Sequence, residues 1–140
     1  MVILACIDGS DQSPKVIDTA ITHARRWDAD LSVIHVFQPP VTLYALDMGM
    51  ALELDDLEES EREGVWERVS GLLDESGLPW TRIDRRGYPV AEITAAAEEI
   101  GADLIVIGCR GRGNLASLVL GSTSHGVIQH APCDVLVVRG

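Results

Sequence analysis

A glycine-rich segment from residue 108 to residue 124 combines the residue types that bind phosphate groups. It reads Gly-Cys-Arg-Gly-Arg-Gly-Asn-Leu-Ala-Ser-Leu-Val-Leu-Gly-Ser-Thr-Ser and follows the apolar run 104–107. Glycines allow backbone N–H groups to approach a ligand closely. The hydroxyl residues 122–124 begin an expected helix, where unpaired donors and the positive end of the helix dipole attract anions. The segment therefore predicts a loop that binds a nucleotide polyphosphate.

The spacing of these glycines differs from two common nucleotide fingerprints. The order Gly108-x2-Gly111-x-Gly113 is not Gly-x-Gly-x-x-Gly, and it follows the fourth expected strand rather than the first. The P-loop needs a lysine beside its last glycine, but the only lysine of the chain is Lys15. Arg110 and Arg112 are the candidate counter-charges for phosphate, with simple solvent exposure as the alternative.

The composition fits one globular domain with an acidic surface. The 140 residues are 46% hydrophobic, and acidic residues outnumber basic ones by 22 to 11, which gives a formal charge of −11. The acidic run 53–63 predicts a solvated helix face. Nucleic-acid binding is not expected, because it requires a basic surface. A nucleotide would be held by local donors, arginines and a divalent cation against the overall field.

Cysteine usage and hydropathy predict a cytoplasmic protein. Cys6, Cys109 and Cys133 are odd in number and lack Cys-x-x-Cys spacing, so we expect reduced thiols rather than a disulfide framework or a zinc site. Cys109 lies inside the glycine-rich segment and is a candidate reactive thiol. No apolar run is long enough to span a bilayer and no secretory signal is visible, so membrane insertion is not expected.

Strands and helices alternate along the chain. The inner strands are continuously apolar, which predicts a five-stranded parallel sheet with helices on both faces, a single doubly wound α/β domain over residues 1–140. The third strand alternates with polar residues and is expected at a sheet edge. The expected strands are 2–7, 31–37, 80–85, 104–107 and 135–138, and the expected helices are 14–27, 52–76, 90–100 and 122–130.

Two details of the helices are also predicted. Ser13 and Pro14 are expected as the N-cap and first residue of the first helix. The long second helix is expected to bury one side, formed by Leu54, Leu57, Val65, Val69, Leu72 and Leu73.

The turn 8–10 and the loop that begins at residue 108 follow the first and fourth strands. Ligands of doubly wound sheets bind beyond the carboxyl ends of the strands, where the winding reverses. If the first and fourth strands are neighbours, both loops face one crevice.

These motifs together resemble the ATP-binding branch of the universal stress protein family. Gly108-x2-Gly111-x9-Gly121-Ser122 reproduces the ATP-binding signature of that branch. One departure is Asp134, where the family has proline, and this should affect only the start of the last strand. The resemblance covers nearly the whole chain apart from 41–76. It includes residues 2–10, His35-Val36, Gly87-x-Pro89, 103–108 and 130–139.

The resemblance implies a role for each part of the site. Adenine is expected near Ile7 and the backbone of Val36, and ribose at Asp8, which could also help to hold a metal. A turn or cap role is the alternative for Asp8, and a plain N-cap for the hydroxyls 122–124; both roles can coexist with binding. The implied ligand is ATP with Mg²⁺ or Mn²⁺. The residues expected to bind it are Ile7, Asp8, Val36, Gly108, Arg110, Gly111, Arg112, Gly113, Asn114, Gly121, Ser122, Thr123 and Ser124.

The function that follows is a cytoplasmic, ATP-binding regulatory protein of the stress response. The resemblance implies a homodimer through the C-terminal strand Val135–Val138, an exposed edge that favours pairing with a second copy. An unidentified protein partner is expected. Two alternatives stay open: slow ATP hydrolysis or self-phosphorylation, and a nucleotide-free dimerisation module, against which the intact signature argues. No catalytic residue is assigned, and the scattered histidines His23, His35, His125 and His130 show no carboxylate partner in the sequence.

Overall fold

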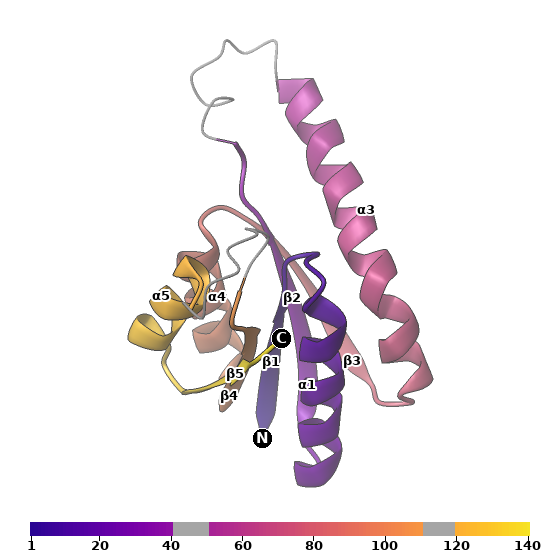
Figure 1. Cartoon of the computed structure of the whole chain (residues 1–140), viewed down its shortest axis with the longest axis vertical. Helices are drawn as coiled ribbons and strands as arrows, with labels where there is room; N and C mark the ends of the chain where they lie inside the picture. The colour runs from indigo at the N-terminus through magenta and orange to yellow at the C-terminus, as the bar shows by residue number, and fades with distance from the viewer. Residues whose placement is uncertain (41–50, 111–119) are drawn as a thin grey trace.

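The computed structural model describes residues 1–40, 51–110 and 120–140. These residues form a five-stranded parallel sheet in the order β3-β2-β1-β4-β5, with helices on both sides (Figure 1). The strands are β1 Val2–Ile7, β2 Asp30–Phe37, β3 Trp80–Arg86, β4 Leu104–Gly108 and β5 Asp134–Val138. The helices are α1 Ser13–Trp27, α3 Ala51–Glu75, α4 Pro89–Ile100 and α5 Ser122–His130. The predicted doubly wound α/β fold is confirmed.

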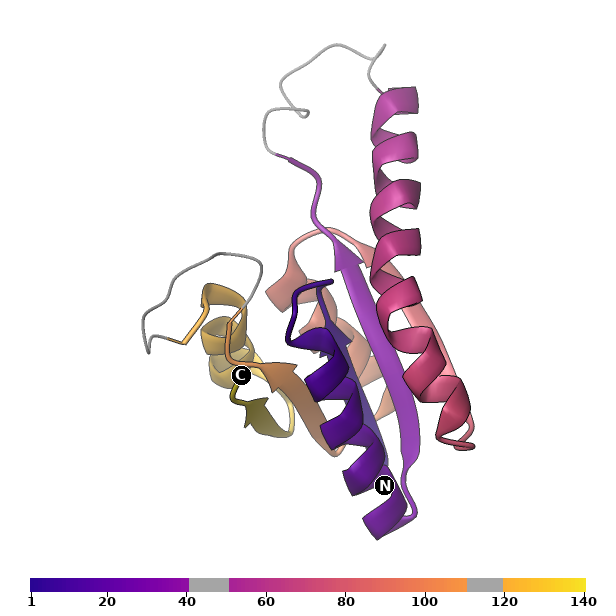
Figure 2. The ribbon, with the colours of Figure 1, turned by 45° about the vertical axis from the view of Figure 1, so that its right-hand side comes forward.

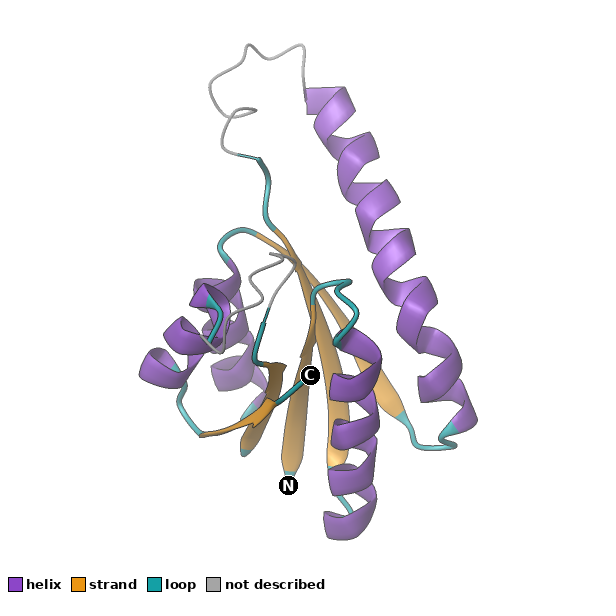
Figure 3. Cartoon of the chain, viewed as in Figure 1, coloured by secondary structure: helices purple, strands orange, loops and turns teal. Residues whose placement is uncertain are grey.

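Each face of the sheet carries its own apolar layer, because successive strand residues point to opposite faces. Ile3 on β1 belongs to the layer under α1 and α3, whereas its neighbour Leu4 belongs to the layer under α4 and α5. Figures 2 and 3 show the two helix pairs on opposite sides of the sheet. The continuous apolar runs of β1 and β4 follow from this double cover, since neither face meets water.

The winding of the sheet reverses between β1 and β4. From β1 the chain adds β2 and β3 on one side, and then crosses to add β4 and β5 on the other. Ile3 pairs with Leu104 and Ala5 pairs with Val106, so the first and fourth strands are neighbours, as predicted. Their carboxyl ends therefore open at one point of the sheet edge, the usual place for a ligand in this architecture.

The predicted start of α1 is wrong by one residue. Gln12, not Ser13, is the N-cap residue, and Ser13 begins the helix. The Ser13 hydroxyl accepts hydrogen bonds from the backbone N–H groups of Asp8 and Gly9, at 3.3 and 3.2 Å. The hydroxyl therefore supports the turn after β1 instead of capping its own helix.

The predicted apolar face of α3 is only partly confirmed. Val65, Val69 and Leu73 are buried, but Leu57 and Leu72 are 44% and 36% exposed. The N-terminal half of α3 extends beyond the carboxyl edge of the sheet (Figure 1). In the turn that holds Leu57, the neighbouring Glu58 is the buried residue and bonds to Arg86 of β3, whereas Leu57 stays exposed. None of the described helices is both long and apolar enough to cross a membrane.

Candidate functional site

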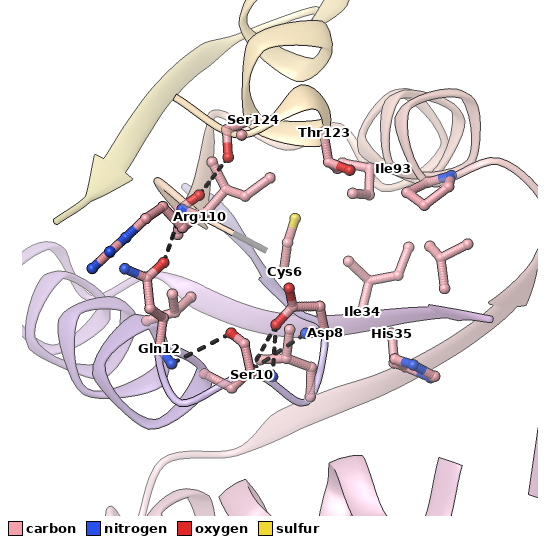
Figure 4. A pocket seen from close by; sticks show the side chains of 18 of the residues that line it. Cys6, Asp8, Ser10, Gln12, Ile34, His35, Ile93, Arg110, Thr123 and Ser124 are labelled. Carbon is pink, nitrogen blue, oxygen red and sulfur yellow. Dashed lines mark hydrogen bonds between the residues drawn. The ribbon is translucent and has the colours of Figure 1, made fainter. Parts of the chain in front are cut away.

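A pocket of about 470 Å³ opens at the carboxyl edge of the sheet, at the point where the winding reverses. The turn after β1, the ends of β2 and β4, and the first turns of α4 and α5 form its walls (Figure 4). It contains an apolar part and a polar part, which differ in the ligand chemistry they favour.

The apolar part is lined by residues of β1, β2 and α4. Ile34 on β2 and Ile93 on α4 are buried and face the pocket (Figure 4). Ile7 at the end of β1 also lines it. The half-buried Val36 completes this wall, so the structure lines the pocket with both residues predicted to contact adenine. An apolar slot bordered by backbone groups suits a planar heterocycle.

The polar part is formed by the start of α5 and the end of β4. Gly121 is the N-cap residue of α5 and has extended backbone angles, φ −62° and ψ 157°, with no side-chain cap. The first-turn N–H groups of a helix have no partner within it, so this end attracts anions. Ser122, Thr123 and Arg110 line the same part of the pocket. Its donors and positive charge favour a phosphate.

Ser124 differs from the other two hydroxyl residues. Its side chain is 3% exposed, and its hydroxyl donates a hydrogen bond to the carbonyl of Gly108. A serine hydroxyl has a single hydrogen, so that of Ser124 joins α5 to β4. Ser122 and Thr123 are therefore better placed than Ser124 to donate to a ligand.

Asp8 combines a turn role with a place in the pocket. Its Oδ1 atom accepts a hydrogen bond from the backbone N–H of Ser10 at 2.9 Å and from the Ser13 hydroxyl at 3.3 Å. These bonds fix the carboxylate at the pocket wall. The alternative turn role of Asp8 is confirmed, and the ribose contact that the resemblance implies stays a prediction.

The expectation that no histidine has a carboxylate partner is wrong for His35. Its Nε2 atom lies 3.5 Å from Oε2 of Glu61, and its Nδ1 atom lies 4.0 Å from Oδ1 of Asp84. His35 is 2% exposed, and both it and Glu61 line the pocket. Asp84 is its register partner on β3, so the pairing of β2 with β3 was the signal that could have found it. Across the described ranges, no group of His, Cys, Asp and Glu has metal-binding geometry.

The three thiols lie in different environments. Burial raises the pKa of Cys6 far above its usual range, and it also raises the pKa of Cys133. The pKa of Cys109 is lowered, chiefly because the Gln12 amide donates a hydrogen bond to its sulfur, with smaller contributions from the Gly140 backbone and from Arg110. Cys109 is therefore the thiol with the greatest thiolate character.

The structure brings most of the predicted site residues together. Those in the pocket wall are Ile7, Asp8, Val36, Gly108, Arg110, Gly121, Ser122, Thr123 and Ser124. Gly111, Arg112, Gly113 and Asn114 lie outside the described residues. Sequence reasoning missed Gln12, His35, Glu61 and Ile93 as pocket residues. Gln12 follows the predicted turn 8–10, and that position was the signal that could have found it, whereas Glu61 and Ile93 lie in helices without a binding motif.

The fold and pocket define a doubly wound parallel α/β domain with a ligand-sized pocket at its topological switch point. The universal stress protein family matches residues 1–139, and the chain belongs to that family. It is 36% identical over 144 residues to universal stress protein YxiE of Bacillus subtilis (strain 168), covering 98% of this chain and 97% of that protein.

Solved structures of the family share the fold. Universal stress protein UspA from Lactobacillus plantarum has a TM-score of 0.85 and 26% identity, covering 99% of this chain and 97% of that one. A universal stress protein in complex with cAMP has a TM-score of 0.73 and 23% identity, covering 99% and 96%. At 23% identity, the similarity to the cAMP complex shows a shared fold alone.

Proposed function

We propose that this chain binds ATP in the pocket at the carboxyl edge of its sheet and uses it as a regulatory ligand. One observation carries the proposal: a single pocket of about 470 Å³ joins an apolar slot to a helix N-terminus with hydroxyls and an arginine. A nucleotide has the same two-part chemistry, an aromatic base and an anionic tail. The cAMP complex of a family member supports a nucleotide of this class.

The charges in the pocket favour one orientation of the nucleotide. Arg110 and the start of α5 stand at one end, whereas the carboxylate of Glu61 lies beside His35 at the end of β2. A triphosphate would be repelled by Glu61 and attracted by Arg110. The base therefore packs on Ile7 and Val36, and the phosphates extend toward Gly121. Gly111, Arg112, Gly113 and Asn114 belong to the same proposed phosphate site.

A divalent cation would arrive with the nucleotide. The phosphates would hold Mg²⁺ or Mn²⁺, and Asp8 is the carboxylate that lines the pocket on the ribose side. The fixed orientation of Asp8 by Ser10 and Ser13 suits either a ribose hydroxyl or a cation-bound water. The ion would neutralise part of the triphosphate charge in a chain whose formal charge is −11.

The C-terminal edge of the sheet is the proposed homodimer contact. β5 is an outer strand, and its residues Val135, Leu136 and Val137 are only partly buried. An apolar edge strand pairs readily with a second copy of itself, and a two-fold axis would make the contact symmetric. ATP would then act by shifting the population of dimer or partner-bound states, a regulatory role rather than fuel. Sedimentation of a monomer at micromolar concentration would contradict the dimer.

Two measurements test the nucleotide proposal: the nucleotide that is released from purified protein, and the thermal stability of the protein with added ATP. We expect adenine nucleotide in the supernatant of denatured protein. We also expect ATP with Mg²⁺ to raise the thermal unfolding midpoint, since a ligand at 100 times its Kd contributes about 2.7 kcal/mol.

Two glycine variants check the location of the nucleotide. Gly111→Val and Gly121→Val should abolish the ATP shift while the ligand-free protein stays folded. If both variants respond to ATP as the wild type does, the nucleotide lies elsewhere.

A further inference from the structure

We propose that Gln12 is a positioning residue for the phosphate end of this pocket, an inference that rests on the proposed ATP site. Its side-chain carboxamide bonds to two consecutive residues directly after β4, Cys109 and Arg110. The Oε1 atom accepts a hydrogen bond from the backbone N–H of Arg110 at 3.0 Å (Figure 4). The Nε2 atom donates to the sulfur of Cys109 at 3.5 Å. Gln12 thus holds the chain at the point where it leaves the strand and enters the glycine-rich loop.

Gln12 is itself fixed by the turn from which it projects. It is the N-cap residue of α1, and its carbonyl accepts the N–H of Val16 at 3.0 Å. Its own N–H donates to the Ser10 hydroxyl at 3.3 Å, and the Ser10 N–H donates to Asp8. A continuous series of hydrogen bonds therefore connects Asp8, through Ser10 and Gln12, to Arg110. The proposed ribose and phosphate contacts are joined by one network.

Gly108 provides the space that this arrangement needs. A Cβ atom at residue 108 would lie 2.7 Å from Oε1 of Gln12, closer than such atoms approach. The first glycine of the signature therefore leaves room for the carboxamide of Gln12 where it now lies, and a side chain at residue 108 would displace it. This contact also gives the glycine a role that can be tested without a ligand.

The hydrogen bond between the Arg110 N–H and Gln12 limits which groups of Arg110 can bind a phosphate. Arg110 is one of the residues that line the pocket, but its backbone N–H donates to Gln12, so Arg110 can reach a phosphate only through its side chain. Both hydrogen bonds of the Gln12 carboxamide go to residues beside the phosphate end, Cys109 and Arg110, so we expect its effect to fall on the phosphates.

The test compares ATP with adenosine, because adenosine has the same base and ribose but no phosphates. Titration calorimetry is performed on the wild type, on Gln12→Met, which keeps the volume but removes both hydrogen bonds, and on Gln129→Met. Gln129 is an exposed residue of α5 outside the pocket, so it controls for the chemical change. We expect Gln12→Met to weaken ATP binding by about three- to tenfold and to leave adenosine binding unchanged. Gln129→Met should match the wild type for both ligands.

A double-mutant cycle with Gly108 gives a second, independent readout. Gly108→Ala should displace the carboxamide and weaken ATP binding by a similar factor. In a Gln12→Ala background, the same Gly108→Ala change should have little further effect, because the obstructing atom is gone. Amide exchange at Arg110 should be faster in Gln12→Met than in the wild type.

The outcomes separate this inference from the proposed function. If the wild type binds ATP more tightly than adenosine and Gln12→Met keeps that ratio, the role of Gln12 is overturned while the ATP site stands. If Gln12→Met weakens both ligands equally, the residue is merely structural and the inference fails. If the wild type binds no ATP, the proposed function fails and this inference fails with it.

Discussion

The indole N–H of Trp66 on α3 donates a hydrogen bond to the carboxylate of Asp84 on β3, at 2.8 Å. Asp84 also accepts the Nε hydrogen of Arg82 at 2.7 Å and faces the ring of buried His35 at 4.0 Å. The long acidic helix is thereby joined to the outer strand behind the pocket. Trp66 also stacks on Trp80, with ring centroids 5.9 Å apart.

Trp66→Phe tests this connection. Phenylalanine keeps an aromatic ring in the core but loses the N–H donor and part of the volume, so unfolding should become easier by about 1–2 kcal/mol. Trp27 is 44% exposed, and Trp27→Phe should change stability by less than about 0.5 kcal/mol. Chemical denaturation of both variants measures the difference. Equal effects would show that the hydrogen bond to Asp84 contributes nothing.

Much of the fold could be predicted from the sequence because its signals are local. The apolar run of β1 and the stop at Pro132 after α5 each depend on neighbouring residues, and these elements were predicted within a residue or two. The edge position of β3 followed from its polar alternation. The burial of Leu57 was predicted wrongly, because in that turn of α3 the charged Glu58 is the buried residue, held by Arg62 and Arg86, and an apolar periodicity does not reveal such a contact.

The site could be predicted in part for the same reason. Glycines and hydroxyls in one segment mark the end of β4 and the start of α5, and they line the pocket. His35 and Glu61 carry no such local signal. They reach the pocket because the fold brings β2 and α3 to the same edge of the sheet, a relationship that appears only once the chain is folded. Gln12 directly follows the turn 8–10, but nothing in its residue type marks the bond that it makes to Arg110.

Two arginines contact the buried carboxylate of Glu58, so the effects of their substitution on stability should be strongly coupled. The Glu58 side chain is almost fully buried and accepts hydrogen bonds from Arg62 at 2.5 Å and from Nε of Arg86 at 2.8 Å. The same contact, together with Asp55, raises the pKa of Arg86. Either Arg62→Met or Arg86→Met leaves one cation beside the carboxylate and should cost about 1 kcal/mol of stability.

The Arg62→Met/Arg86→Met double variant leaves that carboxylate without a cation. It should cost about 3 kcal/mol or more, exceeding the sum of the single changes. Urea unfolding of the four proteins gives the coupling free energy. A strictly additive result would show that solvent, rather than the second arginine, compensates the charge of Glu58.

Two glycines in helices should respond oppositely to alanine. A Cβ at Gly126 in α5 would lie 2.6 Å from Cγ2 of Val90 on α4, whereas a Cβ at Gly64 in α3 would meet nothing within 4 Å. Gly126→Ala forces the two helices apart and should cost about 1–3 kcal/mol. Gly64→Ala removes only the entropy penalty of glycine and should stabilise by about 0.5–1 kcal/mol. Thermal unfolding of the two variants measures both effects. If both substitutions stabilise the protein, the contact between α4 and α5 is loosely packed.

Cys109 should be the first thiol to react with an alkylating reagent. Its pKa is lowered, so its thiolate appears at a lower pH than that of an ordinary cysteine, whereas Cys6 and Cys133 have raised pKa values. Near pH 7.5, iodoacetamide should label Cys109 fastest, Cys133 more slowly, and buried Cys6 only on unfolding. Peptide mass spectrometry over time measures the order. Because Gln12 is the main cause of the shift, Gln12→Met should slow labelling at Cys109 and move its pH profile upward, while Gln129→Met leaves both unchanged. Labelling of Cys133 ahead of Cys109 would contradict the electrostatic environment described for the end of β4.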